Sequence, residues 1–178
     1  RACVGEHRRI ELAGGTQLDL NTGTAIDVVF DASQRLIHLR EGEVLIRTGK
    51  LGVQTPFYVE TRQGRIQALG TRFTVRQLSS STRVGVLEDR VSVSPADQPN
   101  HVRLLEAGES ADFDRQNVSD NSAYSGSQAA WVDGQLIVLD ARLGNVIDEL
   151  ARYRPGVLQC DLASARLRVS GTFRLDST

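Results

Sequence analysis

The dipeptide Gly70-Thr71 is the first place where this sequence could carry out a reaction. A Thr hydroxyl in a strained turn can attack the preceding Gly carbonyl, which converts the peptide bond into an ester that water cleaves. The alternative is a Gly that makes a tight turn before a strand, followed by a β-favouring Thr. Because Gly-Thr also occurs at 15–16, 23–24 and 171–172, the dipeptide alone leaves both interpretations open.

The other reactive side chains form no catalytic pattern in the sequence. His7, His38 and His101 are far apart along the chain and far from Cys, so we expect His38 to be a solvated or hydrogen-bonded strand residue. Asp112 and Asp114 alternate along a strand end, which favours a solvated face over acid–base chemistry. There is no nucleophile elbow, phosphate-binding loop or zinc-protease motif. We expect no turnover enzyme and no cofactor.

The two cysteines, Cys3 and Cys160, are too few and too far apart for a zinc cluster. In an oxidising compartment they could form a disulfide. The alternative is two separate thiols, with Cys160 buried in a strand. Spacing along the chain does not show proximity, so both possibilities stay open.

The composition of the 178 residues excludes several classes of protein. A hydrophobic content of 40% indicates a folded chain with a core, in one mid-sized or two small domains. Lys+Arg 21 against Asp+Glu 22 leaves no basic field, and aromatic residues are only 5%, so we expect no nucleic-acid partner. No apolar run approaches the roughly 20 residues of a membrane-spanning helix. Since the chain starts at Arg1 and not at Met, we expect a processed product or an excised piece.

Residues 1–115 predict an all-β domain. Val, Ile and Thr alternate with polar residues in many short runs, and Gly, Asp and Pro punctuate them at short intervals. Such spacing favours a sandwich, a barrel or a solenoid-like strand array. The clearest runs are 18–20, 26–30, 35–40, 44–46, 57–59, 73–75, 84–86 and 91–93.

The composition changes after this domain. Residues 116–130 are small, polar and turn-rich, which predicts a linker, and residues 131–178 form a second unit. A strand is expected at 135–139, followed by Asp140 as the N-cap of a helix. Leu143, Val146, Ile147, Leu150 and Tyr153 share one helical face.

Pro155-Gly156 is expected to end this helix. Strand patterning returns at Val157–Cys160 and Arg166–Leu175, which gives the order β-α-β-β. So small a sheet must pack on the first domain or on a partner. The predicted fold class is therefore mainly β, with a sandwich or solenoid-like array followed by a small α/β subdomain.

The order and spacing of several short motifs resemble the periplasmic part of FecR-type transmembrane anti-sigma regulators. The resemblance covers nearly the whole chain, with one departure at Gly14, where the family usually has Asp. The motifs are Gly5–Leu12, Gly15–Thr22, Arg35–Glu43, Pro56–Thr61, Leu69–Val75, Val84–Val93, Leu105–Glu109, Trp131–Leu136, Leu143–Tyr153 and Ser170–Phe173.

The resemblance implies a periplasmic domain of a single-pass inner-membrane protein in a Gram-negative bacterium. Its partners would be the N-terminal signalling domain of a TonB-dependent siderophore receptor and, through a cytoplasmic segment absent here, an extracytoplasmic-function sigma factor for iron-uptake genes. The C-terminal unit resembles the secretin and TonB short domain. The family usually continues past the Gly-Thr-Phe tail with a further helix and strand. Some members cleave themselves at a Gly-Thr bond, and Gly70-Thr71 falls in that motif.

A binding module is therefore the leading hypothesis. The strand Arg166, Leu167, Arg168 and Val169 would offer its edge to a strand of the receptor, with the two arginines guarding it against self-pairing. The alternative is that this strand is internal or is covered by the first domain. Trp131 is either an interface anchor or a packing residue at the domain junction. The competing class is a single-turnover autoprotease whose fragments stay associated. A ligand-binding β domain is disfavoured because the tyrosines are scattered.

Overall fold

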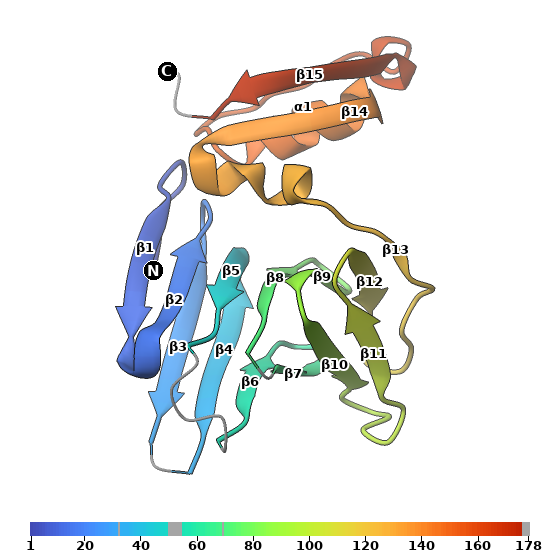
Figure 1. Ribbon diagram of the computed structural model, residues 1–178. Coiled ribbons are helices and arrows are strands. Elements are labelled where there is room, and N and C mark those ends of the chain that lie inside the picture. Colours follow the sequence, from blue (N-terminus) through green and yellow to red (C-terminus); the bar gives the residue numbers. More distant parts are fainter. Residues whose placement is uncertain (32, 50–54, 69, 176–178) are drawn as a thin grey trace.

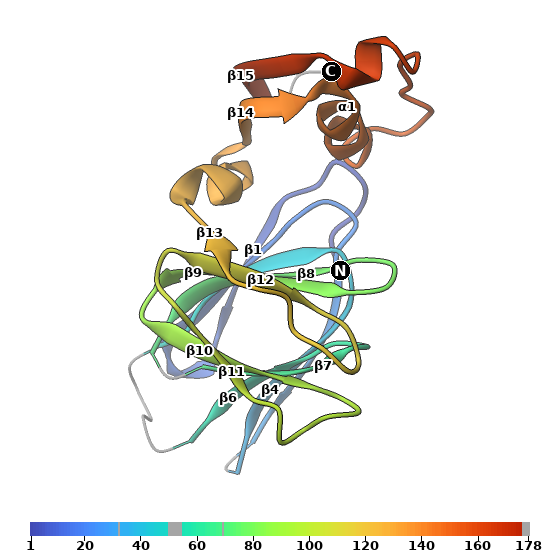
Figure 2. The same ribbon diagram turned by 90° about the vertical axis from the view of Figure 1, so that its right-hand side faces the viewer.

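Two β-sheets that face each other form the larger part of the molecule (Figures 1 and 2). The computed structural model describes residues 1–31, 33–49, 55–68 and 70–175. One sheet has the strand order β1-β2-β5-β8-β9-β12-β13 and the other β11-β10-β7-β6-β4-β3. Neighbouring strands are antiparallel except β4 and β6, which run parallel. The mainly β fold predicted from the sequence is confirmed, and the sheets do not close into a barrel.

Short strands joined by tight turns build both sheets, as the punctuation of the sequence predicts. The elements of this sandwich are β1 Arg8–Leu12, η1 Ala13–Gly15, β2 Thr16–Leu20, β3 Ala25–Phe30, β4 Arg35–Glu41, β5 Glu43–Arg47, β6 Phe57–Glu60, β7 Gly64–Ala68, β8 Arg72–Gln77, β9 Thr82–Glu88, β10 Arg90–Pro95, β11 Arg103–Glu106, β12 Glu109–Phe113 and β13 Ser122–Ala123.

The hydrophobic core lies between the two sheets. Alternate residues of each strand point inward, and the largest fully buried side chains include Phe57, Phe73 and Phe113. The ring of Phe57 meets the ring of Phe30 edge-on, with 5.9 Å between their centroids. Burying each such side chain stabilises the fold by about 1.5–3 kcal/mol. The sandwich is therefore a firm platform for what packs on it.

The turn between β4 and β5 requires glycine. Gly42 has φ +85°, and a Cβ on it would lie 2.3 Å from Oγ1 of Thr24. No larger residue fits this approach. The Thr24 hydroxyl donates to the carbonyl of Glu43 at 3.0 Å, so the turn at residues 21–24 is fixed against the start of β5.

The C-terminal part lies over the outer face of the seven-stranded sheet (Figure 2). Strands β14 and β15 form a two-stranded antiparallel sheet, and α1 packs against β14 and η3. In β15 the half-buried residues Val169, Gly171 and Phe173 alternate with exposed polar ones, whereas β14 carries apolar residues on both of its faces. The elements are η2 Gly126–Asp133, β14 Gln135–Arg142, α1 Leu143–Ala151, η3 Ser164–Arg166 and β15 Arg168–Arg174.

Three local predictions for this part are wrong. Val157–Cys160 is not a strand, because no strand lies beside it in the described chain and Val157 is 83% exposed. Asp140 does not cap the helix: it lies inside β14 at a bulge with φ +49°, and Arg142 precedes α1. Arg166 closes η3, so β15 begins at Arg168. The order is therefore β-α-β.

Both cysteines are free thiols in the structure. Cys3 is exposed, and Cys160 is half-buried in an irregular segment and not in a strand. The prediction that Cys160 is buried in a strand is therefore wrong.

Candidate functional site

The end of α1 docks on the sandwich at the turn of residues 21–24. The hydroxyl of Thr22 donates to the carbonyl oxygen of Arg152 at 2.9 Å, and Nδ2 of Asn21 donates to the hydroxyl of Tyr153 at 2.8 Å. Asn21 and Thr22 are 1% and 4% exposed. Because buried polar groups are costly when unpaired, these bonds fix how the C-terminal part sits on the sandwich.

Three ion pairs extend this contact. We call the whole set the joint; its residues are Asn21, Thr22, Glu43, Arg76, Glu149, Arg152 and Tyr153. One carboxylate oxygen of Glu43 accepts from Nδ2 of Asn21 at 2.9 Å and from Nη1 of Arg152 at 3.1 Å. Arg152 also pairs with Glu149, whose other oxygen lies 2.9 Å from Nη1 of Arg76. Burial lowers the pKa of Arg152, but the carboxylates of Glu43 and Glu149 outweigh this effect and raise it. The joint thus holds two cations and two anions in balance.

Residues near the N-terminus meet the same joint. The amide of Gly5 donates to the hydroxyl of Thr22 at 2.8 Å, and a Cβ on Gly5 would lie 3.0 Å from the carbonyl oxygen of Tyr153. The ring of His7 meets that of Trp131 edge-on at 5.8 Å. The N-terminal segment, the turn of the sandwich and the C-terminal part therefore share one contact region.

Trp131, predicted as either an interface anchor or a packing residue, lies on η2 at the junction of the two parts. Its side chain is 5% exposed and belongs to a small apolar cluster with Leu45, Ala129 and Tyr153, against which Leu175 packs. Its indole nitrogen is buried and has no hydrogen-bond partner among the described residues. In this structure Trp131 packs the two parts together.

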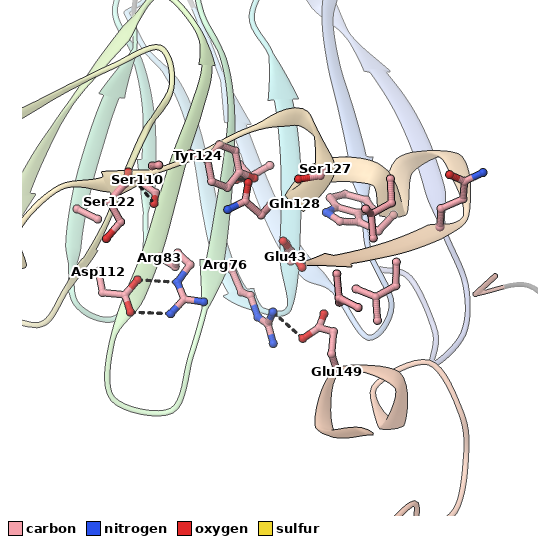
Figure 3. A pocket seen from close by; sticks show the side chains of 18 of the residues that line it. Glu43, Arg76, Arg83, Ser110, Asp112, Ser122, Tyr124, Ser127, Gln128 and Glu149 are labelled. Carbon is pink, nitrogen blue, oxygen red and sulfur yellow. Dashed lines mark hydrogen bonds and ion pairs between the residues drawn. The ribbon is translucent and has the colours of Figure 1, made fainter. Parts of the chain in front are cut away.

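A cleft of about 480 Å³ separates β14 from the outer face of the seven-stranded sheet (Figure 3). On its sandwich wall, Arg83 donates to both carboxylate oxygens of Asp112, at 2.7 and 2.9 Å. The hydroxyl groups of Tyr124 and Thr74 lie 2.7 Å apart, and burial raises the pKa of Tyr124 to about 12. The charged groups of this wall are thus paired with one another, which suits binding better than acid–base chemistry.

The other carboxylates and the strand histidine named in the sequence are also engaged. Asp114 accepts the backbone amides of Gln116 and Asn117, which lower its pKa. His38 lies on β4, half-buried, with Nδ1 3.2 Å from a carboxylate oxygen of Glu60. In the described contacts, neither Asp114 nor His38 lies beside a hydroxyl or thiol group that it could activate.

The predicted edge strand is divided between two elements. Arg166 closes η3 and Leu167 follows it, 58% exposed, whereas Arg168 and Val169 open β15. Along two antiparallel strands, pairs of opposite residues that exchange backbone hydrogen bonds alternate with pairs that do not. Leu143 donates to the carbonyl of Leu167, so the amide of Val169 turns toward β14 and that of Arg168 turns outward.

The structure places Gly70-Thr71 just before β8. Gly70 is exposed with φ +73°, and Thr71 is 2% exposed. The amide of Thr71 donates to Oγ1 of Thr48 at 2.8 Å, and its carbonyl accepts from the amide of Thr48 at 3.0 Å. Oγ1 of Thr71 is buried and has no partner in the described chain, and Leu69 lies outside the described residues.

Reasoning from the sequence missed the polar residues of the joint. Asn21, Thr22, Arg152 and Tyr153 belong to the segments that carry the family resemblance, but no local pattern connects them. Asn21 and Tyr153 are 132 positions apart. The available signal was a polar Asn-Thr pair directly after an apolar strand, and an Arg-Tyr pair at the end of an amphipathic helix.

A family model described as FecR protein matches residues 1–92, somewhat more than half of the chain. The chain belongs to the FecR family. No match is found among the curated proteins.

This FecR protein is also similar to solved structures. Two crystal structures of a candidate anti-sigma factor from Parabacteroides distasonis ATCC 8503, at 1.65 Å and 2.50 Å resolution, match with TM-scores of 0.76 and 0.74. Each is 25% identical, and the match covers 99% of this chain and 84% of the other. Family and fold together assign the FecR protein to the anti-sigma regulators. Among its described helices, none has the length and apolar character needed to cross a membrane.

Proposed function

We propose that this chain is the periplasmic sensor of a FecR-type anti-sigma regulator. It binds the N-terminal signalling domain of a TonB-dependent siderophore receptor and relays that event across the inner membrane to an extracytoplasmic-function sigma factor that controls iron-uptake genes. The observation that carries the proposal is the β14–β15 sheet, which has only two strands and therefore two outer edges that no strand of the described chain covers. Open strand edges accept strands of partner proteins.

The receptor domain docks on the C-terminal part in this proposal. Trp131 packs beneath that part, and Arg166, Leu167, Arg168 and Val169 lead into β15. The assignment of these residues to the partner surface stays a prediction. It is supported by the exposure of Leu167 and by the outer edge of β15, which begins at Arg168.

The joint supplies a route for the signal. A partner that moves the β14–β15 sheet also moves Arg152 and Tyr153 at the end of α1, which contact the turn at Asn21 and Thr22. The hydroxyl of Thr22 holds the amide of Gly5. In the proposed arrangement the N-terminal segment leads toward the membrane, so docking changes the hold on that segment.

Calorimetric titration of this chain with the purified signalling domain of the receptor encoded beside it tests the proposal. We expect saturable one-to-one binding at micromolar or tighter affinity. Leu139→Asp, at an apolar residue of β14 that is 78% exposed, should weaken binding at least about tenfold, because it places a charge on the docking sheet. Val102→Asp is the matched control on the sandwich, where Val102 is 55% exposed. Absence of binding by the folded chain would contradict the proposed function.

Self-cleavage at Gly70-Thr71 is a second candidate function. It is favoured by the positive φ of Gly70 and by the buried, unpartnered hydroxyl of Thr71. That hydroxyl oxygen would attack the carbonyl carbon of Gly70, and the C–N bond would break as the ester forms and the Thr71 nitrogen takes the proton. Water would then hydrolyse the ester, which releases a carboxylate at Gly70 and a hydroxyl at Thr71.

The fold would keep the two fragments together. Strand β8, which starts two residues after Gly70, pairs with β5 of the first fragment and β9 of the second. Intact mass of the denatured chain tests the reaction: we expect fragments that end at Gly70 and start at Thr71, retained in Thr71→Ser and lost in Thr71→Ala. A single full-length mass in fresh and aged samples would contradict it.

A further inference from the structure

The outer edge of β14 is open where it passes the sandwich. Leu175 donates to the carbonyl of Gly134 at 2.9 Å, which makes these two residues a bonded pair in the register of β14 and β15. Hydrogen-bonded and non-hydrogen-bonded pairs alternate along an antiparallel ladder. Ile137–Thr172 is the third pair after Gly134–Leu175, so these two residues do not hydrogen-bond to each other. The backbone N–H and C=O of Ile137 therefore point away from β15, and neither has a partner among the described residues.

The last strand of the seven-stranded sheet ends in a second open edge. Tyr124 donates to the carbonyl of Gly108 at 2.8 Å, so the neighbouring pair Ala123–Glu109 is not bonded. The N–H and C=O of Ala123 point away from β12, again without a partner in the described part of the chain.

Both open edges border one groove. The 480 Å³ cleft and a neighbouring hollow of about 420 Å³ share a set of lining residues that includes Ala123 and Ile137. In Figure 3, Tyr124 lies beside the sandwich strands, and Ser127 and Gln128 lie on η2 next to it. We call this the β13–β14 groove and define it by the shared residues Ala123, Tyr124, Ser127, Gln128, Ile137 and Val138.

The side chains of β14 leave its edge unguarded. Residues 135–139 are Gln-Leu-Ile-Val-Leu, without a charge, and Leu139 at the end of the groove is 78% exposed. By contrast, β15 begins with Arg168 and ends with Arg174. Charged side chains are a usual protection of strands that must stay unpaired. The buried indole N–H of Trp131, which also lines the cleft, lacks an acceptor among the described residues.

We infer that the β13–β14 groove takes an extended strand of the receptor's signalling domain, which pairs with the outer edge of β14. The inference rests on the proposed function, but it places the receptor strand on the outer edge of β14 and not on the edge of β15 at Arg168 and Val169. An extended backbone offers N–H and C=O groups at the spacing of Ile137 and its neighbours, whereas a helix has bonded its own. A strand in this groove contacts the C-terminal sheet and the sandwich together, because Ala123 belongs to the latter.

A pair of matched proline variants tests this inference. Ile137→Pro and Thr172→Pro stand opposite each other in one non-bonded pair, so each removes a single outward N–H and leaves the hydrogen bonds between β14 and β15 intact. Each variant of the whole chain is titrated with the purified signalling domain. We expect Ile137→Pro to weaken binding at least about tenfold, because strand pairing is lost, and Thr172→Pro to stay within about twofold of the parent.

Hydrogen exchange of the unsubstituted chain provides the measurement that needs no variant. Binding should protect the amide of Ile137 from exchange and leave the exchange of the Thr172 amide unchanged. If both proline variants bind weakly, this measurement decides which strand edge the partner uses. Loss of binding in Thr172→Pro alone, or protection of Thr172 alone, would place the partner on β15 and overturn the inference while receptor binding stands. Unchanged binding in both variants, or no protected amide, also overturns it. No binding by the parent chain overturns the proposed function and the inference with it.

Discussion

The hydroxyl of Thr22 lies 2.9 Å from the carbonyl oxygen of Arg152, a residue 130 positions later in the chain. The same hydroxyl accepts the amide of Gly5 at 2.8 Å. One buried oxygen atom therefore connects the N-terminal segment, a turn of the sandwich and the end of α1. Removal of the Thr22 hydroxyl should therefore weaken the contacts among these three segments.

Thr22→Val keeps the shape of the side chain but removes the hydroxyl. We expect the free energy of unfolding to fall by about 1–3 kcal/mol, because the Gly5 amide and the Arg152 carbonyl lose their partner. Amide exchange at Gly5 should accelerate at least about tenfold. Thr22→Ser, which keeps the hydroxyl, is the control. A Thr22→Val chain as stable as the parent, with unchanged exchange at Gly5, would contradict this role.

Glu43→Gln should destabilise the joint. The substitution leaves the cation of Arg152 with Glu149 as its remaining anionic partner in a largely buried place, so we expect a loss of about 3 kcal/mol. Glu60→Gln, at the more exposed ion pair with Arg65, is the control and should cost less than about 1 kcal/mol. Chemical denaturation of both variants measures the difference. Equal losses would show that the joint is no stronger than a surface pair.

Alkaline pH should open the joint. Burial raises the pKa of Tyr153 to about 12, above the usual value of about 10 in an unfolded chain. The unfolded state therefore loses its proton first, so the stability is complete below pH 10 and falls as the pH rises toward 12. Tyr153→Phe should reduce this slope, which denaturation at several pH values measures. Because burial raises the pKa of Tyr124 to about 12 as well, the double variant with Tyr124→Phe should flatten the profile further.

Trp131 is the only tryptophan of the chain, so its fluorescence reports on the junction alone. We expect a blue-shifted emission in the parent, since the side chain is 5% exposed, and a red shift in Glu43→Gln. Trp131→Ala should cost about 3–5 kcal/mol and Trp131→Phe clearly less. An emission maximum typical of solvated indole in the folded parent would contradict the packing described above.

Much of the fold could be predicted from local patterns. Alternation predicts strands such as 35–40 and 91–93, and the spacing of Leu143, Val146 and Leu150 predicts α1. The wrong predictions occur where the local structure depends on a neighbouring strand and not on the local residues alone. Val157–Cys160 has strand-like residues but no adjacent strand in the described chain. Asp140 has the residue type and position of a helix cap, and the bulge in β14 has no sequence signature.

The candidate site could be predicted only in part. Trp131 was expected at the domain junction, and it packs there. The bond between Asn21 and Tyr153 joins two residues whose proximity depends on the whole sandwich, and each residue alone resembles an ordinary turn or helix end. The open edges at Ala123 and Ile137 depend on strand register, which alternation does not determine across separate elements.

The joint also determines the order of events during folding. Three of its hydrogen bonds join residues more than 100 positions apart, so we expect them to form only after the turn at 21–24 and the helix at 143–151. Sandwiches built from distant strands fold in milliseconds to seconds, and closing the joint adds a later step. In a refolding experiment the signal of Trp131 should therefore develop after the far-ultraviolet circular dichroism of the sheets. On the ribosome, the sandwich emerges before the C-terminal part with which it forms the joint.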